Sequence, residues 1–295
     1  MIINSGNLQG LFKGFNISFN KGLSNTTMHY GTVAMKIPST NRETTYSWLG
    51  AMPGIREWIG DRVMHSLDLH QYSILNRLFE ITVSVPRTQI EDDQYGVFGP
   101  IFEKMGGDTA LHPDDLVFGL LKNGFTGTCF DGQFFFDTDH PIGRGDDIIS
   151  YSNFNAGAGP AWFLLDCSQA LKPVIYQERL PFELTQITEA TDENVFFKDK
   201  FIYGARGRSN AGYGLWQLAS ASKDTLSADN YSAARTAMQS IKSDSGKPLG
   251  ITPTHLVVPP SLERDARRLL KALHDQGGTN EWAGSAELIV TPFVI

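Results

Sequence analysis

Cysteine and long apolar runs are both scarce in this sequence. Only Cys129 and Cys167 occur among its 295 residues, which excludes the disulfide framework of a small secreted protein and favours a reducing compartment. No stretch reaches the roughly 18 consecutive apolar residues of a transmembrane helix. The initial segment has no basic residues ahead of its apolar part, which Lys13 and Lys21 interrupt. We therefore expect the chain to have no secretory signal and to be synthesised in the cytosol.

The motifs of several enzyme classes are absent as well. The sequence has no G-x-S-x-G nucleophile elbow and no G-x-x-x-x-G-K-[ST] phosphate loop. Its seven histidines are scattered, and neither C-x-x-C nor H-E-x-x-H occurs, so zinc has little support. The glycine-rich run 204–214, GARGRSNAGYG, has strand signals on both sides. We interpret it as the solvent-exposed tip of a hairpin.

Basic residues are outnumbered by acidic ones, whereas aromatic residues are abundant. The 25 lysines and arginines against 32 aspartates and glutamates give a net charge of −7, which argues against a surface covered in basic patches for nucleic acid. The 19 phenylalanines and 41% apolar content favour well-filled cores or wide interfaces.

One short segment gathers the residue types of a metal or hydrolytic site. Residues 129–141, CFDGQFFFDTDHP, contain a thiol, three carboxylates and an imidazole. On an extended strand Asp137 and Asp139 would share one face. Together with Asp131 and His140 they would suit a metal-dependent hydrolase. The calcium-loop pattern D-x-[DN]-x-[DN]-G-x5-E is absent, so an EF-hand is excluded.

The same segment also fits a purely structural interpretation. Asp131 and Gly132 form a favoured turn dipeptide, and the three phenylalanines at 134–136 are typical of a short buried strand. Aspartates in the next turn, which ends at Pro141, can accept hydrogen bonds from nearby backbone amides. From the residues alone both interpretations stay open.

Apolar periodicity in the first half predicts helices and one clear strand. Residues 79–85 have apolar side chains at every second position, as in a strand. Residues 97–123 are mostly helical in pattern, with a kink or break expected at Gly106-Gly107 and Pro113. A short amphipathic helix is predicted over 6–15. We expect it to pack on another part of the fold or on a neighbouring molecule.

The second half alternates strands and helices. A helix is predicted over 227–242 with Ser227 as its N-cap, followed by a strand over 255–258. Another helix follows Ser261, and a last strand covers 286–290. The predicted class is therefore α+β or mixed α/β.

Several long runs carry a more specific similarity. They are YSWLGAMPGIREWIGDR (46–62), NRLFEITVSVPRTQIEDDQYGVFGP (76–100), HPDDLVFGLLKNGF (112–125), FDGQFFFDTDHP (130–141), SNFNAGAGPAWFLLD (152–166), GYGLWQLA (212–219), KPLGITPTHLVVPPSLERDARRLL (247–270) and GGTNEWAGSAELIVTPF (277–293). In this order, and over nearly the whole chain, they resemble the major head subunit of Mu-like phages and prophages.

The resemblance implies the Hong Kong 97-type fold of tailed-phage capsids, an α+β fold. Its parts would be an N-terminal arm (1–40), an E-loop hairpin with its peripheral-domain root (41–93), a peripheral domain with a long spine helix and a following turn segment (94–154), a mainly axial domain (155–280) and a C-terminal strand (281–295). The segment 130–141 would then be the exit from the spine helix toward the axial domain, which favours its structural interpretation.

The resemblance also implies a structural protein and no enzyme. The chain would self-assemble into hexamers and pentamers of an icosahedral head that encloses double-stranded DNA. Catalytic residues, cofactors, metal ions and a membrane are not expected. Partners would be other copies, a separate scaffolding protein, the portal and a maturation protease. The chain would be made and assembled in the host bacterial cytoplasm and would end in the virion.

One further expectation follows. An aromatic anchor among charges of both signs is typical of an interface, and it predicts subunit contacts at Arg56, Glu57, Trp58, Asp61 and Arg62.

Two alternative functions stay open. They are a non-viral nanocompartment shell of the same fold and, with less support, the metal-dependent hydrolase that would use the 131–140 cluster.

Overall fold

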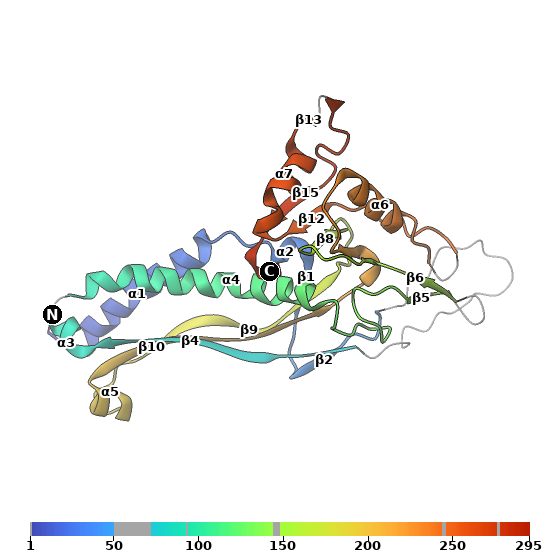
Figure 1. Cartoon of the computed structure of the whole chain (residues 1–295). Helices are drawn as coiled ribbons and strands as arrows, with labels where there is room; N and C mark the ends of the chain where they lie inside the picture. Colours follow the sequence, from blue (N-terminus) through green and yellow to red (C-terminus); the bar gives the residue numbers. More distant parts are fainter. Residues whose placement is uncertain (1, 50–71, 93, 144–147, 244–245, 276–277) are drawn as a thin grey trace.

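The main elements of the described structure are two long helices, α1 and α4, and two sheets of four and five strands (Figure 1). The computed structural model describes residues 2–49, 72–92, 94–143, 148–243, 246–275 and 278–295. Within these ranges no helix has both the length and the apolar character that crossing a membrane requires. An elongated part formed by helices α1 and α4 over long strands meets a second part that carries helices α6 and α7.

The longest element is helix α4 (Gly99–Asn123), which continues from a 3-10 turn, η1 (Gln94–Phe98). Its 25 residues span about 37 Å. The helix predicted over 97–123 is thus confirmed, and of the kink or break predicted in its middle, the break does not occur. Pro113 lies inside the helix without ending it.

The two helices cross so closely that their backbones touch, and this explains the glycines. Helix α1 (Ser5–Asn25) is longer than the predicted 6–15 and packs on α4. A Cβ atom on Gly22 would lie 1.9 Å from the Glu103 carbonyl oxygen, and one on Gly106 would lie 2.0 Å from that of Phe19. Gly106 is therefore required for close packing of the helices, which is why it does not interrupt α4.

A four-stranded sheet in the order β1-β9-β10-β4 lies beside these helices. Its strands are β1 (Ala34–Pro38), β9 (Val174–Ile187), β10 (Lys200–Tyr213) and β4 (Arg77–Pro86). The alternating strand over 79–85 is confirmed as part of β4, and its antiparallel partner is β10. The short strands β2 (Glu43–Thr45) and β3 (Ser73–Leu75) pair separately.

The hairpin tip predicted at 204–214 is wrong, because this run lies within and just after the single 14-residue strand β10. A Cβ atom on Gly207 would lie 2.6 Å from the Phe182 ring, and one on Gly212 would lie 2.4 Å from the Ile74 side chain. These glycines do not form a turn. Because they have no side chain, Phe182 and Ile74 can pack directly on the backbone of the strand.

The second sheet has the order β15-β12-β8-β11-β7. Its strands are β15 (Glu287–Val290), β12 (His255–Val258), β8 (Trp162–Leu165), β11 (Ala219–Ser222) and β7 (Phe154–Asn155). Helices α6 (Ala228–Gln239) and α7 (Glu263–Lys271) accompany it. The predicted strands here are confirmed, and so is the Ser227 cap, whose side chain accepts a bond from the Asn230 amide.

The remaining described elements are short. They are α2 (Tyr30–Val33), α3 (Arg87–Glu91), α5 (Glu193–Lys198), β5 (His140–Ile142), β6 (Ile149–Tyr151), β13 (His274–Asp275), β14 (Gly278–Thr279) and the 3-10 turns η3 (Trp216–Leu218), η4 (Pro260–Leu262) and η5 (Pro292–Val294).

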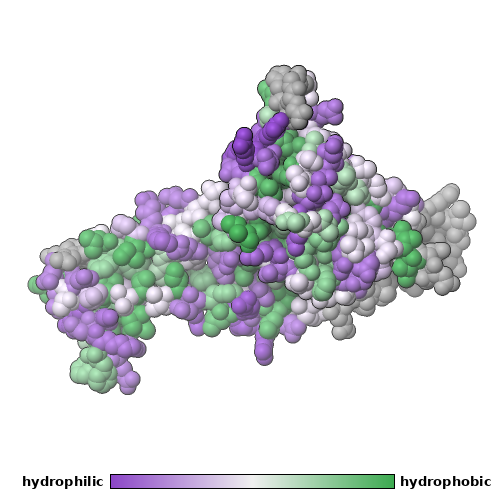
Figure 2. All heavy atoms as spheres, viewed as in Figure 1, coloured by the Kyte–Doolittle hydropathy of each residue, from purple (hydrophilic) through white to green (hydrophobic). Residues whose placement is uncertain are grey.

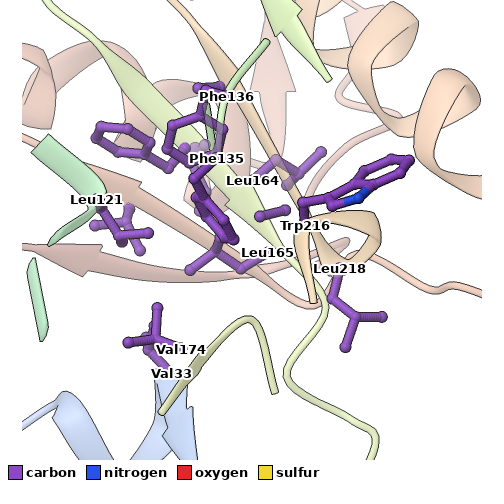
Figure 3. Close-up of a cluster of buried hydrophobic side chains, with 14 of the residues drawn as sticks. Val33, Leu121, Phe135, Phe136, Leu164, Leu165, Val174, Trp216 and Leu218 are labelled. Atoms are coloured by element: carbon purple, nitrogen blue, oxygen red, sulfur yellow. The ribbon is translucent and has the colours of Figure 1, made fainter. Parts of the chain in front are cut away.

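The buried side chains form two clusters. The smaller lies between α1, α4 and the long strands, where the Phe15 ring stacks on Phe102 at 4.1 Å between centroids. The larger joins the end of α4 to the five-stranded sheet and includes Leu121, Phe135 and Phe136 (Figure 3). The segment that follows α4 therefore inserts Phe135 and Phe136 into the main core.

Candidate functional site

The candidate site is the segment that leaves α4 and enters β5. Thr128 and Phe134 form an isolated antiparallel bridge, and Gly132 occupies the turn with a φ of 90°, a conformation that glycine adopts without strain. Phe135 and Phe136 are buried, but Phe134 is 44% exposed and 134–136 form no strand, so the short buried strand predicted here is wrong. The turn thus brings its two ends together and faces Asp131 toward His140.

A chain of hydrogen bonds links three of the candidate ligands. The Cys129 thiol donates to Asp131 Oδ1 at 3.0 Å, and His140 Nδ1 lies 2.8 Å from Asp131 Oδ2. Because an ionised carboxylate only accepts, Nδ1 carries the proton and donates. The His140 ring is fully buried and stacks on Trp216 at 4.0 Å with an interplanar angle of 12°.

The electrostatics of this group suit a structural role. Burial alone would raise the pKa of Asp131, but hydrogen bonds from His140 and Cys129 outweigh it and hold that pKa below its usual value. Burial, reinforced by the adjacent Asp131 carboxylate, raises the pKa of the Cys129 thiol. The thiol therefore stays protonated, whereas a metal ligand or nucleophile needs the thiolate.

The four residues of the hydrolase hypothesis do not meet. Asp137 accepts bonds from the backbone amides of Phe134 and Thr138, at 3.2 and 2.7 Å, and so closes its own turn. Asp139 is exposed. In the described part of the chain, only Cys129, Asp131 and His140 place three potential ligand atoms within 4.8 Å of one another.

The Nε2 atom of His140 is buried and has no hydrogen-bond partner among the described residues. Nδ1 alone forms the hydrogen bond of the ring, to Asp131. The arrangement orients the turn and the Trp216 ring. It does not bring together a nucleophile, a base and open space for a substrate.

The predicted interface residues Arg56, Glu57, Trp58, Asp61 and Arg62 lie outside the described residues. Sequence reasoning missed a different surface feature, the adjacent phenylalanines of α5. Phe196 and Phe197 are 73% and 77% exposed. Two adjacent phenylalanines in a segment rich in acidic residues were the available signal, but only the fold shows that both rings point outward.

The comparisons with known proteins agree with this architecture. The model of the Mu-like prophage major head subunit gpT family matches residues 8–294. The Mu-like prophage FluMu major head subunit of Haemophilus influenzae is 47% identical over 272 residues, which cover 90% of this chain and 88% of that protein. The major capsid protein of Escherichia phage Mu is 41% identical, and the alignment covers 100% of both chains.

Solved structures agree over a similar length. The subunit of the bacteriophage JBD30 procapsid has a TM-score of 0.87 and 42% identity, covering 99% of this chain and 100% of that one. The JBD30 capsid subunit has a TM-score of 0.80 and 30% identity, with 100% of both chains covered. Sequence and fold thus support the predicted capsid architecture and favour neither alternative. The chain belongs to the Mu-like prophage major head subunit family, and it is a structural capsid protein rather than an enzyme.

Proposed function

We propose that copies of this chain form hexameric and pentameric rings, which close into an icosahedral head around double-stranded DNA. The observation that carries the proposal is the distribution of apolar side chains over the surface (Figure 2). Among the described residues, eight large apolar side chains are more than 60% exposed, at Ile2, Ile17, Leu78, Val97, Phe196, Phe197, Leu273 and Ile295. They occur at both ends of the chain and along its elongated part. Contacts with neighbours in a shell would cover them.

The parts of the capsid subunit have natural counterparts here. Helix α4 has the length and place of the spine helix. In this proposal the pairing of β2 with β3 is the base of the E-loop. The proposed axial domain of 155–280 would contain β8, β11 and β12 of the five-stranded sheet together with α6 and α7, whereas β15 lies beyond this range. Strands β9 and β10, within the same range, instead lie beside α4.

The charge of the chain is compatible with enclosing DNA. A net charge of −7 repels the DNA backbone, and a wall that does not hold DNA tightly eases both packaging and ejection. In this proposal a separate scaffolding protein, a portal and a maturation protease act during assembly in the host cytoplasm, and the finished head is part of the virion.

The proposal predicts assembly of the purified chain. Sedimentation velocity at rising protein concentration, with a family scaffolding protein in one arm, should show rings and then much larger particles. Material extracted from infected or induced cells should contain DNA that survives nuclease treatment. A chain that remains monomeric in every arm would contradict self-assembly. Closed shells that protect an enzyme and no DNA would favour the nanocompartment.

A further inference from the structure

The far end of the β9–β10 hairpin carries an apolar knob. Helix α5 (Glu193–Lys198) caps this hairpin and projects from the elongated part (Figure 1). Val195 is buried and anchors the helix, while the rings of Phe196 and Phe197 meet edge to face at 5.2 Å and point outward. Two adjacent phenylalanines that are about three-quarters exposed mark a contact surface rather than ordinary surface scatter.

The knob is surrounded by acidic residues. The segment 188–199, TEATDENVFFKD, contains four acidic residues and one lysine, which gives a net charge of −3. Asp192 caps α5 by accepting a bond from the Asn194 amide. Glu193 is exposed at the first turn of the helix. A partner surface should therefore offer an apolar recess with positive charge beside it.

Such a recess lies between α1 and the start of α4. It is a hollow of about 460 Å³ whose lining includes Gly10, Gly14, Leu11 and Phe15. Unlike Gly22 at the helix crossing, Gly10 and Gly14 would place a Cβ atom in open space, with nothing within 4 Å. These two glycines are not needed for packing within the chain, so they leave the hollow open.

The charge of α1 complements that of the knob. The helix contains Lys13 and Lys21 and no acidic residue, which gives +2. Lys21 is paired with Glu103 at 2.9 Å. Lys13, next to Gly14, is exposed and makes no ion pair with any residue in the described ranges. Ile17 and Val97 extend the apolar surface near the hollow, at 70% and 65% exposure.

We propose that the α5 knob of one copy docks into the α1–α4 recess of a neighbouring copy. The inference rests on the proposed function, since it names one contact by which copies join. The occupant is a second copy because the knob is exposed in its own chain, while knob and recess match in apolar character and in charge. Such a contact uses two different surfaces of the same chain, and repeating it gives a ring when the rotation between neighbours closes.

Filling the recess gives the sharpest test. Gly10→Leu places a side chain in the open hollow, and in a helix leucine is favoured over glycine. The unassembled variant should fold at least as well as wild type, yet the assembled fraction in sedimentation velocity should fall at least tenfold. Gly119→Leu is the matched control, because Gly119 lies on α4 with equally open space at its Cβ.

The knob is tested in parallel. Phe196→Ser/Phe197→Ser should lose assembly to the same extent, while Phe196→Leu/Phe197→Leu should keep most of it. Mixed Gly10→Cys and Phe197→Cys chains should give a disulfide-linked pair on non-reducing gels. A Gly119→Cys and Phe197→Cys mixture should give only background.

The outcomes separate the two proposals. Failure of the wild-type chain to assemble counts against the proposed function. Normal assembly of both Gly10→Leu and Phe196→Ser/Phe197→Ser, or cross-linking no greater than in the control mixture, overturns the docking proposal while leaving the proposed function intact.

Discussion

Replacing Gly22 with alanine is expected to lower the free energy of unfolding by about 2–3 kcal/mol, the upper part of the range for overpacking a tight contact. The new Cβ atom would lie 1.9 Å from the Glu103 carbonyl oxygen, a backbone atom that cannot rotate away. Helices α1 and α4 must therefore separate, which loosens the Phe15–Phe102 stack. Chemical denaturation of the unassembled protein measures the change.

Gly14→Ala is the matched control for this experiment, because it makes the same substitution in the same helix. A Cβ atom there meets nothing within 4 Å, so alanine should stabilise the helix by about 0.5–1 kcal/mol. Opposite signs at the two positions are the expected result. Equal effects at Gly22 and Gly14 would contradict the close crossing of the helices.

The second large effect is expected for Asp131→Ala, which should lower the free energy of unfolding by about 3 kcal/mol. The change removes the carboxylate that accepts from His140 Nδ1–H and from the Cys129 thiol, and a lost bond to a charged group costs about 1.5–3 kcal/mol. Asp139→Ala is the control. Its side chain is exposed, so the effect should stay within about 0.5 kcal/mol.

The contribution of Asp131 to the free energy of unfolding should change with pH in a definite direction. The folded protein holds the pKa of Asp131 below its ordinary value of 3.8, so the folded state favours the ionised form. The contribution is complete above the ordinary pKa and is lost as pH falls through the lowered value. The stability difference between wild type and Asp131→Ala should thus be constant near neutrality and shrink below about pH 4. A difference that instead grew on acidification would contradict the role of Asp131 as an ionised acceptor.

Local signals predicted those elements that local physics decides. The alternation in 79–85 fixed a strand because a half-buried sheet surface imposes a period of two. The serine at 227 predicted a helix start because its side chain satisfies an amide left free there. Neither signal depends on which partner the element meets in the fold.

Local reasoning from glycine gave two wrong predictions, a break at Gly106 and a hairpin tip at 204–214. Locally, glycine is typical of a turn or a break. Here Gly106 instead allows the backbone of α1 to approach, and Gly207 and Gly212 allow the Phe182 and Ile74 side chains to approach. Phe182 and Ile74 belong to elements remote in sequence from the glycines that admit them. No local pattern distinguishes a glycine that bends the chain from one that lets another element approach.

The candidate site shows a related limit. The sequence left a metal centre and a structural turn both open at 129–141, because either use needs carboxylates and an imidazole. The decision came from Trp216, which stacks on His140 from a segment 76 residues away, and from the burial that keeps the thiol protonated. The resemblance to phage capsid subunits favoured the structural interpretation without supplying that physical reason.

The measurement that tests the central claim most directly is a cryo-electron microscopy reconstruction of particles formed by the purified chain. The account predicts closed shells built from rings of five and six subunits. It also predicts that the exposed apolar side chains, Phe196 and Phe197 among them, are covered by neighbouring copies. Discrete monomers, or particles in which these surfaces face solvent and no rings form, would contradict it.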